Sequence, residues 1–151
     1  MMSISLSNVN KVYTIGYEGK GFDEFLNLLE EYNIKQVVDV RSYPTSKRNK
    51  FAKDNLKDEL FKASIKYRHL AQLGGLRDKD YQDIMKEEEW QAGFKELKDL
   101  AAEKKTVMLC LESNPMKCHR RFITEELEKE GWEVVHIGEG GSWKGKRLDE
   151  F

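Results

Sequence analysis

The sequence predicts a single α/β domain with a mainly parallel sheet of about four or five strands and helices on both faces. Strand-like and helix-like segments alternate along the chain, and a strand–helix–strand unit requires parallel strands. One late segment, TVMLCLE at residues 106–112, is almost continuously apolar, as expected of a central strand covered on both faces. A chain of 151 residues has the size of one domain.

In the first half, KVYTIG at residues 11–16 is strand-like and ends in a glycine. Apolar residues at helical spacing, with two acidic residues in the first turn, predict a helix from residue 21 to about residue 33. The β-branched run KQVVDVR at residues 35–41 predicts the second strand, followed by a loop that contains serine and proline. Residues 53–63 predict a helix, and residues 65–70 predict a shorter strand.

In the second half, Asp78 is the expected cap of a short helix, and residues 90–101 predict a further helix with an apolar stripe. The central strand at residues 106–112 follows. A helix at residues 118–130 then ends at a glycine and leads to a last strand, residues 133–137. This order of elements is typical of flavodoxin-like and Rossmann-like domains, in which ligands bind beyond the carboxyl ends of the strands.

Composition excludes several classes of protein. With 39% hydrophobic and 35% charged residues and a net charge of -1, the chain is neither intrinsically disordered nor globally basic. It has no apolar run of about 18 residues and no charged start followed by an apolar stretch, so we expect a cytoplasmic protein without a membrane partner. We expect both cysteines to be thiols. We also expect residues 1–10 and 140–151 to be loosely ordered tails.

The densest group of chemically reactive residues is CLESNPMKCHRR at residues 110–121. A cysteine beside cations at a helix N-terminus has a lowered pKa and becomes nucleophilic, although a cysteine on a buried strand can simply pack. The phosphatase arrangement, an arginine six residues after the cysteine, is absent, because Met116 and Thr124 occupy those positions. The sequence also lacks the standard spacing of zinc ligands and the glycine-rich fingerprints of nucleotide-binding loops.

A second group lies at residues 37–51, VVDVRSYPTSKRNKF. Asp39 and Arg41 are two residues apart on the expected strand, so their side chains share a face and can form an ion pair. That pair is either structural or part of a binding site. The hydroxyls and cations after it suit a phosphate group, and a solvated charged loop is the alternative.

The same residues resemble the family called domain of unknown function 488. The matching blocks are TIGYEG at residues 14–19, VVDVRSYPTS at residues 37–46 with Phe51 after it, YRHLAQLGGL at residues 67–76, CLESNPMKCHRR at residues 110–121, and VVHI at residues 134–137. The resemblance implies an α/β domain with a cysteine–glutamate element and a Cys-His-Arg element as candidates for catalysis. It identifies no established reaction, and the cofactor is unknown.

Our leading hypothesis is an enzyme that acts on a phosphate-bearing small molecule, a nucleic acid or another anionic substrate. The candidate catalytic residues are Asp39, Cys110, Glu112, Cys118 and His119, and the candidate anion-binding residues are Arg41, Ser46, Arg48, Arg120 and Arg121. The first alternative is a non-catalytic module that binds nucleic acid or a protein partner through the same cations. The second is a structural zinc domain, with His69 or His136 completing a site of two cysteines and His119.

Overall fold

The structure is a computed structural model that describes residues 10–41, 49–74, 80–110, 119–138 and the backbone of 141–144. The strands are β1 (Lys11–Gly16), β2 (Gln36–Asp39), β3 (Lys66–His69), β4 (Thr106–Cys110), β5 (Glu133–Gly138) and β6 (Gly141–Lys144). The helices are α1 (Phe22–Glu31), α2 (Lys53–Lys62), α3 (Tyr81–Ile84), α4 (Glu88–Glu103) and α5 (Arg120–Lys129), with short 3₁₀ turns η1 (Asn49–Phe51) and η2 (Ala71–Leu73).

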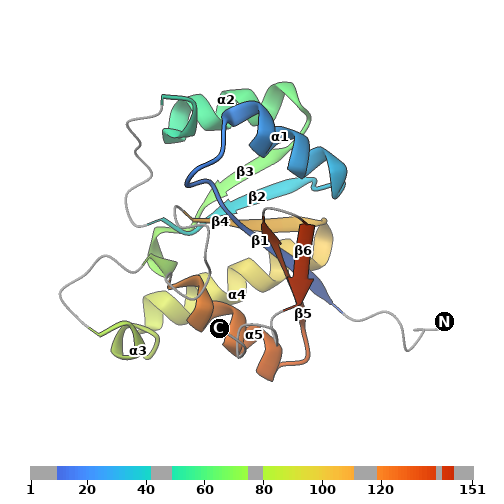
Figure 1. The fold of residues 1–151 in the computed structure, drawn as a ribbon. Helices are drawn as coiled ribbons and strands as arrows, with labels where there is room; N and C mark the ends of the chain where they lie inside the picture. Colours follow the sequence, from blue (N-terminus) through green and yellow to red (C-terminus); the bar gives the residue numbers. More distant parts are fainter. Residues whose placement is uncertain (1–9, 42–48, 75–79, 111–118, 139–140, 145–151) are drawn as a thin grey trace.

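The described strands form one six-stranded sheet in the order β3-β2-β4-β1-β5-β6. The first five strands are parallel, and β6 runs antiparallel to β5. Helices α1 and α2 cover one face, and α3, α4 and α5 cover the other (Figure 1). The predicted α/β class, with a mainly parallel sheet and helices on both faces, is therefore confirmed.

Two hydrophobic cores lie on the two sides of the sheet. On the α1/α2 side, Phe25 and Leu60 pack with alternate strand residues such as Leu109. On the α4/α5 side, Trp90 packs in the cluster that contains Met108. Because β4 supplies alternate side chains to both cores, all five of its residues are buried, which explains its almost unbroken apolar sequence.

Three helices end in the same way before a strand. Asn33, Ser64 and Gly131 adopt positive φ angles of 57°, 62° and 93°, just after α1, α2 and α5. The next residue then donates its N–H to the carbonyl five positions earlier, as in Ile65 to Leu60 at 2.8 Å. This is a Schellman ending, in which the left-handed residue lets the chain turn straight into the following strand.

Three sequence expectations require correction. Asp80, rather than Asp78, caps α3 by accepting the Gln82 N–H, and Asp78 lies outside the described residues. Helix α5 begins at Arg120, two residues later than expected, because His119 is its N-cap residue. Residues 141–144 form β6 instead of a loose tail, because they pair antiparallel with β5, with Gly141 opposite Gly138.

Candidate functional site

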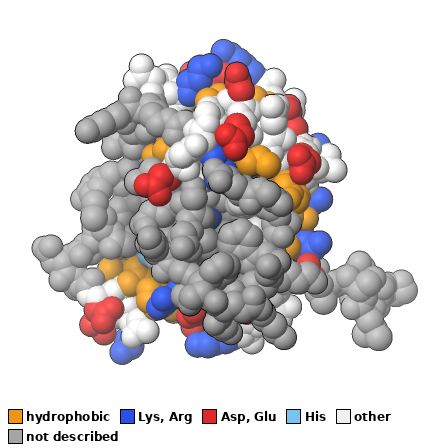
Figure 2. Space-filling model, viewed as in Figure 1, with side chains coloured by type: hydrophobic (Ala, Val, Ile, Leu, Met, Phe, Trp, Pro, Cys, Tyr) orange, Lys and Arg blue, Asp and Glu red, His pale blue; other side chains and the backbone are white. Residues whose placement is uncertain are grey.

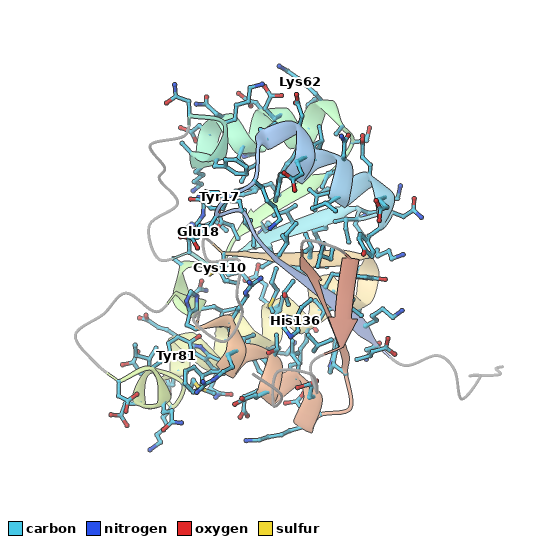
Figure 3. All side chains as sticks on the ribbon, in the orientation of Figure 1. Tyr17, Glu18, Lys62, Tyr81, Cys110 and His136 are labelled. Carbon is cyan, nitrogen blue, oxygen red and sulfur yellow. The ribbon has the colours of Figure 1, made fainter. Side chains whose placement is uncertain are left out.

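The carboxyl ends of β2, β4 and β1 lie side by side, and the helices that follow these neighbouring strands go to opposite faces of the sheet. The helices that follow β1 and β2 cover one face, whereas α5, which follows β4 between them, covers the other. The Tyr17 N–H donates to the Cys110 carbonyl at 3.2 Å, and the Val40 N–H donates to the Leu109 carbonyl at 3.0 Å. Figure 3 shows Tyr17, Glu18 and Cys110 at this edge of the sheet. Such an edge is where ligands bind in open α/β sheets.

Asp39 and Arg41 form the buried ion pair that their spacing predicts. Arg41 Nε donates to Asp39 Oδ1 at 2.8 Å, and Nη2 donates to Oδ2 at 2.6 Å. The two side chains are 0% and 6% exposed. The backbone N–H of Arg41 also donates to Oδ1, at 3.1 Å, so the carboxylate fixes the first residues after β2.

Two tyrosines and a backbone carbonyl complete this network. Tyr67 on β3 donates its O–H to Asp39 Oδ2 at 2.6 Å, while Arg41 Nη1 donates to the Tyr17 oxygen at 3.2 Å and to the Phe51 carbonyl at 2.9 Å. The Tyr17 and Phe51 rings stack with centroids 4.3 Å apart. Both oxygens of Asp39 and all three nitrogens of Arg41 are therefore engaged, which gives the pair a positioning role.

The network also shifts the pKa values of its members. Burial, followed by the Asp39 charge and hydrogen bond, raises the pKa of Tyr67 well above its usual value. For Arg41, burial disfavours the charged form, but the hydrogen bond and charge of Asp39 outweigh it and raise the pKa. Near neutral pH, Tyr67 is thus a hydrogen-bond donor and Arg41 a permanent cation.

Two histidines hold the chain just beyond β2. His119 Nε2 donates to the Val40 carbonyl at 2.9 Å, and His69 Nε2 donates to the Arg41 carbonyl at 2.7 Å, because a carbonyl oxygen can only accept. Burial, and secondarily the Arg120 charge, lowers the pKa of His119, although the Val40 hydrogen bond opposes the shift. His119 is therefore neutral near pH 7, and Nδ1 is the ring nitrogen that carries the lone pair.

A buried polar triad lies beneath α5, on the other side of the sheet from Tyr17. Thr14 Oγ1 is 2.6 Å from His136 Nδ1 and accepts a hydrogen bond from Arg120 Nη1 at 3.2 Å. Arg120 and His136 are each 1% exposed, and Figure 3 shows His136 between the sheet and α5. Burial and the nearby Arg120 charge lower the pKa of His136 to about 3, so the imidazole stays neutral beside the guanidinium.

The other described candidates, Cys110 and Arg121, are placed differently. Cys110 is 4% exposed and takes part in a disulfide bond, which corrects the expectation of a free thiol. Its side chain packs with the α4/α5 core at the end of β4. Arg121 Nε lies 3.7 Å from Glu125 Oε2, one turn further along α5, and its guanidinium stacks on Phe122.

The structure thus pairs Asp39 with Arg41 on the α1/α2 side of the sheet and sets His119 against the Val40 carbonyl between them. It directs Arg120 into the α4/α5 side, toward Thr14. Four candidates, Ser46, Arg48, Glu112 and Cys118, lie outside the described residues. Within the described ranges, no group of three or more His, Cys, Asp or Glu side chains is arranged to hold a metal ion. The helices of these ranges also include none with the length and hydropathy of a membrane span.

The hydrogen-bonding roles of Thr14, Tyr67 and His136 were not predicted from the sequence. Thr14 and His136 are directly paired across β1 and β5, and both occupy inward positions of otherwise apolar strands. A polar side chain at such a position needs a hydrogen-bond partner, so these two residues could have been predicted to meet. Tyr67 carries no comparable signal, because only the register of β3 against β2 brings it to Asp39.

The fold and the site define a three-layer, doubly wound α/β domain with a polar network at the carboxyl edge of its parallel strands. Residues 21–127 match the family model called domain of unknown function DUF488. The chain belongs to this family, as the sequence resemblance implied. No curated protein and no solved structure matches the chain.

Proposed function

We propose that the protein is an enzyme that acts on a phosphate-bearing or otherwise anionic substrate, with His119 as the group that accepts a proton. The observation that carries this proposal is the position of His119, which is half-buried at the N-cap of α5 and hydrogen-bonded to the residue that follows β2. A general base must be neutral near the working pH and held in one orientation, and both conditions favour this histidine.

The surrounding residues support the choice of an anionic substrate. Helix α5 has ten residues, and the N–H groups of its first turn carry partial positive charge that favours a negative group. The buried cation Arg120 lies in the first turn of this helix and adds to the positive potential, whereas the charge of Arg41 is balanced by Asp39. In this proposal both arginines position the site, and Ser46, Arg48, Glu112 and Cys118 remain candidates for direct contact with the substrate.

Any role of Cys110 in the reaction depends on the redox state of its disulfide bond. A disulfide sulfur is not a nucleophile, whereas the thiolate formed on reduction is. Activity that appears only after treatment with dithiothreitol would assign the cysteines to the reaction, and equal activity with and without dithiothreitol would leave His119 as the reactive group. The proposal includes a cytoplasmic location, which rests on the sequence alone.

The test compares two histidines that make the same kind of contact. Glutamine keeps a donor at the position of Nε2 but is not a base, so both His119→Gln and His69→Gln preserve the hydrogen bond to a backbone carbonyl. Hydrolysis of a panel of phosphate mono- and diesters is measured for the wild type and both variants. We expect His119→Gln to lose roughly 10²- to 10⁴-fold in kcat and His69→Gln to retain most of it.

Three results would reject the proposal. The first is full activity of His119→Gln, and the second is an equal loss in both variants, which would indicate a positioning role. The third is an inactive wild type that binds a single-stranded oligonucleotide with a steep salt dependence, unchanged in His119→Gln. That result would favour a nucleic-acid-binding module. Figure 2 shows positive and negative side chains interspersed on the described surface, which does not favour such a module.

A further inference from the structure

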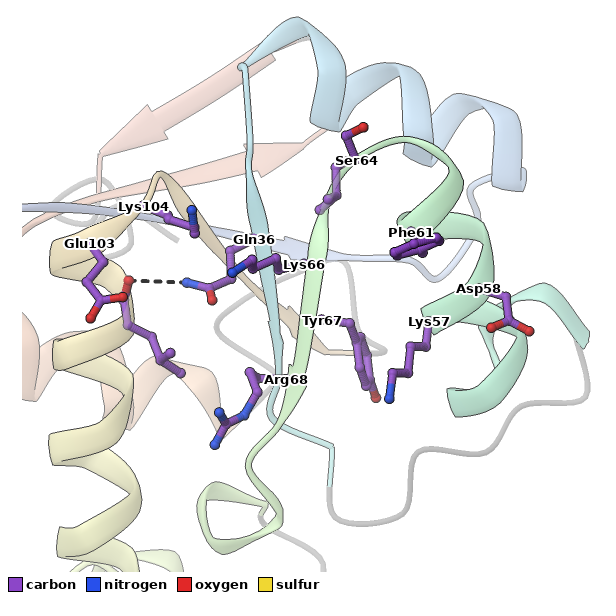
Figure 4. A pocket seen from close by; sticks show the side chains of 12 residues that line it. Gln36, Lys57, Asp58, Phe61, Ser64, Lys66, Tyr67, Arg68, Glu103 and Lys104 are labelled. Atoms are coloured by element: carbon purple, nitrogen blue, oxygen red, sulfur yellow. Dashed lines mark hydrogen bonds between the residues drawn. The ribbon is translucent and has the colours of Figure 1, made fainter.

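A groove lies along the outer edge of β3, the edge that faces away from β2. Its volume is about 880 Å³, and its walls are formed by the end of α2 and the end of α4 (Figure 4). Strand β3 is the terminal strand on this side of the described sheet. The floor of the groove is therefore a strand edge.

The backbone of β3 has hydrogen-bonding groups that point into this groove. The N–H groups of Lys66 and Leu70 donate to carbonyls of the β2 segment at 3.0 and 2.9 Å, so the alternate residues Tyr67 and His69 direct their N–H and C=O groups to the open edge. No backbone hydrogen bond within the described part of the chain uses these outward groups. The edge can accept one more strand.

The two sides of the edge differ in chemistry. On the α2 side lie Tyr67 and Phe61, and Phe61 is 81% exposed, the one exposed large hydrophobic side chain among the described residues. On the α4 side lie Lys66, Arg68 and Lys104. A strand laid along β3 would direct alternate side chains to these two sides.

The charges of the groove favour an acidic occupant. It is lined by four cations and two carboxylates, Asp58 and Glu103. Arg68 is paired with Glu96, but no ion pair within the described residues involves Lys57, Lys66 or Lys104. An incoming strand with carboxylates on one face would supply these partners.

We propose that the β3 edge binds an extended segment of a partner protein that alternates acidic and apolar residues. The segment adds a strand to the sheet, its carboxylates meet Lys66 and Lys104, and its apolar side chains cover Phe61 and Tyr67. Backbone hydrogen bonds to Tyr67 and His69 supply the affinity, and the alternation supplies the specificity.

A second copy of the same chain is a poor occupant of this edge. Two copies of β3 could pair antiparallel about a twofold axis. Centring the pair on residue 66 places Lys66 opposite Lys66, and centring it on residue 68 places Arg68 opposite Arg68. Centring it on residue 67 places Lys66 opposite Arg68. Like charges directly opposite one another destabilise a strand pair, and lysine on an edge strand is a common means of preventing self-association. The same cations that oppose self-pairing attract an acidic strand.

The test uses a short acetylated and amidated peptide that alternates glutamate and valine. Its binding to the full chain is measured by calorimetry, and the affected amides are located by NMR. We expect saturable binding, with the largest shifts at the Tyr67 and His69 amides. We expect Lys66→Glu and Phe61→Ser each to weaken it roughly tenfold or more. The control variant is Lys86→Glu, since the Lys86 side chain is 81% exposed and outside the groove.

Control peptides separate the two parts of the proposal. Replacing glutamate with lysine removes the charge complementarity, and N-methylation of alternate residues removes the strand pairing, so both should abolish binding. The proposal is overturned if the glutamate peptide does not bind at low salt, if it binds equally well after either change, or if the groove variants behave like Lys86→Glu. A wild-type dimer that dissociates in Phe61→Ser would instead assign the edge to a second copy.

Discussion

Tyr67 links two parts of the molecule through a single side chain. Its ring lines the β3 groove, and its O–H donates to Asp39 in the network at the carboxyl edge. We expect Tyr67→Phe to lower the free energy of unfolding by about 1.5–3 kcal/mol, because it removes a hydrogen bond to a buried carboxylate. Urea denaturation measures this loss.

Tyr32→Phe is the matched control for this prediction. Tyr32 is also half-buried, and no hydrogen bond within the described residues involves its hydroxyl. A loss in Tyr67→Phe no larger than the loss in Tyr32→Phe would mean that the hydroxyl does not stabilise Asp39.

His136 makes the stability depend on pH. Its native pKa of about 3 lies below the value of about 6.5 for an unfolded histidine, so the unfolded chain binds a proton that native His136 does not. The contribution of His136 is therefore complete above about pH 6.5 and is lost as pH falls toward 3. We expect His136→Asn to reduce the slope of stability against pH by up to about 1.4 kcal/mol per pH unit.

The slope, rather than stability at one pH, is the useful measurement, since the substitution would also alter packing around the side chain. The lowered pKa of His119 acts in the same direction, so part of the slope should persist in the variant. Identical slopes for the wild type and His136→Asn between pH 4 and about pH 6.5 would show that His136 keeps its ordinary pKa in the native state.

The helix endings provide a prediction for whole elements. Ser64 holds a φ of 62° after α2, a conformation that costs a residue with a Cβ about 1 kcal/mol, whereas Gly131 holds 93° after α5 at little cost. We expect Ser64→Gly to raise the free energy of unfolding by about 0.5–1 kcal/mol and Gly131→Ala to lower it by a similar amount.

Sterics do not complicate this comparison at Gly131. A Cβ added there would meet no atom within 4 Å, so the cost of alanine is that of the backbone conformation alone. Thermal melts of both variants measure the effect. Shifts of equal sign in the two proteins would contradict the assignment of both positions to the same helix ending.

Elements were predictable from the sequence where a local pattern decides the structure. The apolar spacing of α1 and the unbroken apolar run of β4 each identify their element, because burial on one or both faces imposes that pattern. Strand β6 was missed because its signal is the short glycine-containing connection after Gly138, within a segment otherwise polar enough to suggest a tail. The hairpin forms because β5 offers it an open edge.

The sequence indicates which candidate residues lie at the ends of strands, but not the direction in which each side chain points. Asp39 ends β2, Arg41 follows it, and His119 reaches the Val40 carbonyl between the two. Arg120 also lies at the start of α5, yet its side chain turns inward to Thr14. The spacing within one element does not set this direction, because the rotation of α5 on the sheet depends on the packing of Ile123 and Leu127.

At the scale of the whole molecule, the sheet separates two cores that share the same strands. Val107 and Leu109 face the α1/α2 core, while Met108 and Cys110 face the α4/α5 core. Loss of the helices from one face would expose the sheet that the other core needs. The two layers should therefore unfold together.

Tryptophan fluorescence can test this coupling, because two of the three tryptophans, Trp90 and Trp132, lie in the α4/α5 core. Leu60 is fully buried in the α1/α2 core. We expect Leu60→Ala to lower the free energy of unfolding by about 2–5 kcal/mol and to shift the fluorescence and circular dichroism transitions equally, although Leu60 lies on the opposite side of the sheet.

Leu97→Ala is the partner variant, since Leu97 is equally buried but belongs to the α4/α5 core. If the layers are coupled, both variants shift one common transition in both signals. If they are independent, Leu60→Ala changes the circular dichroism transition and leaves the fluorescence transition of the wild type unchanged. That second pattern would show that the sheet holds its α4/α5 layer without the α1/α2 layer, and the shared strands would then not account for cooperativity.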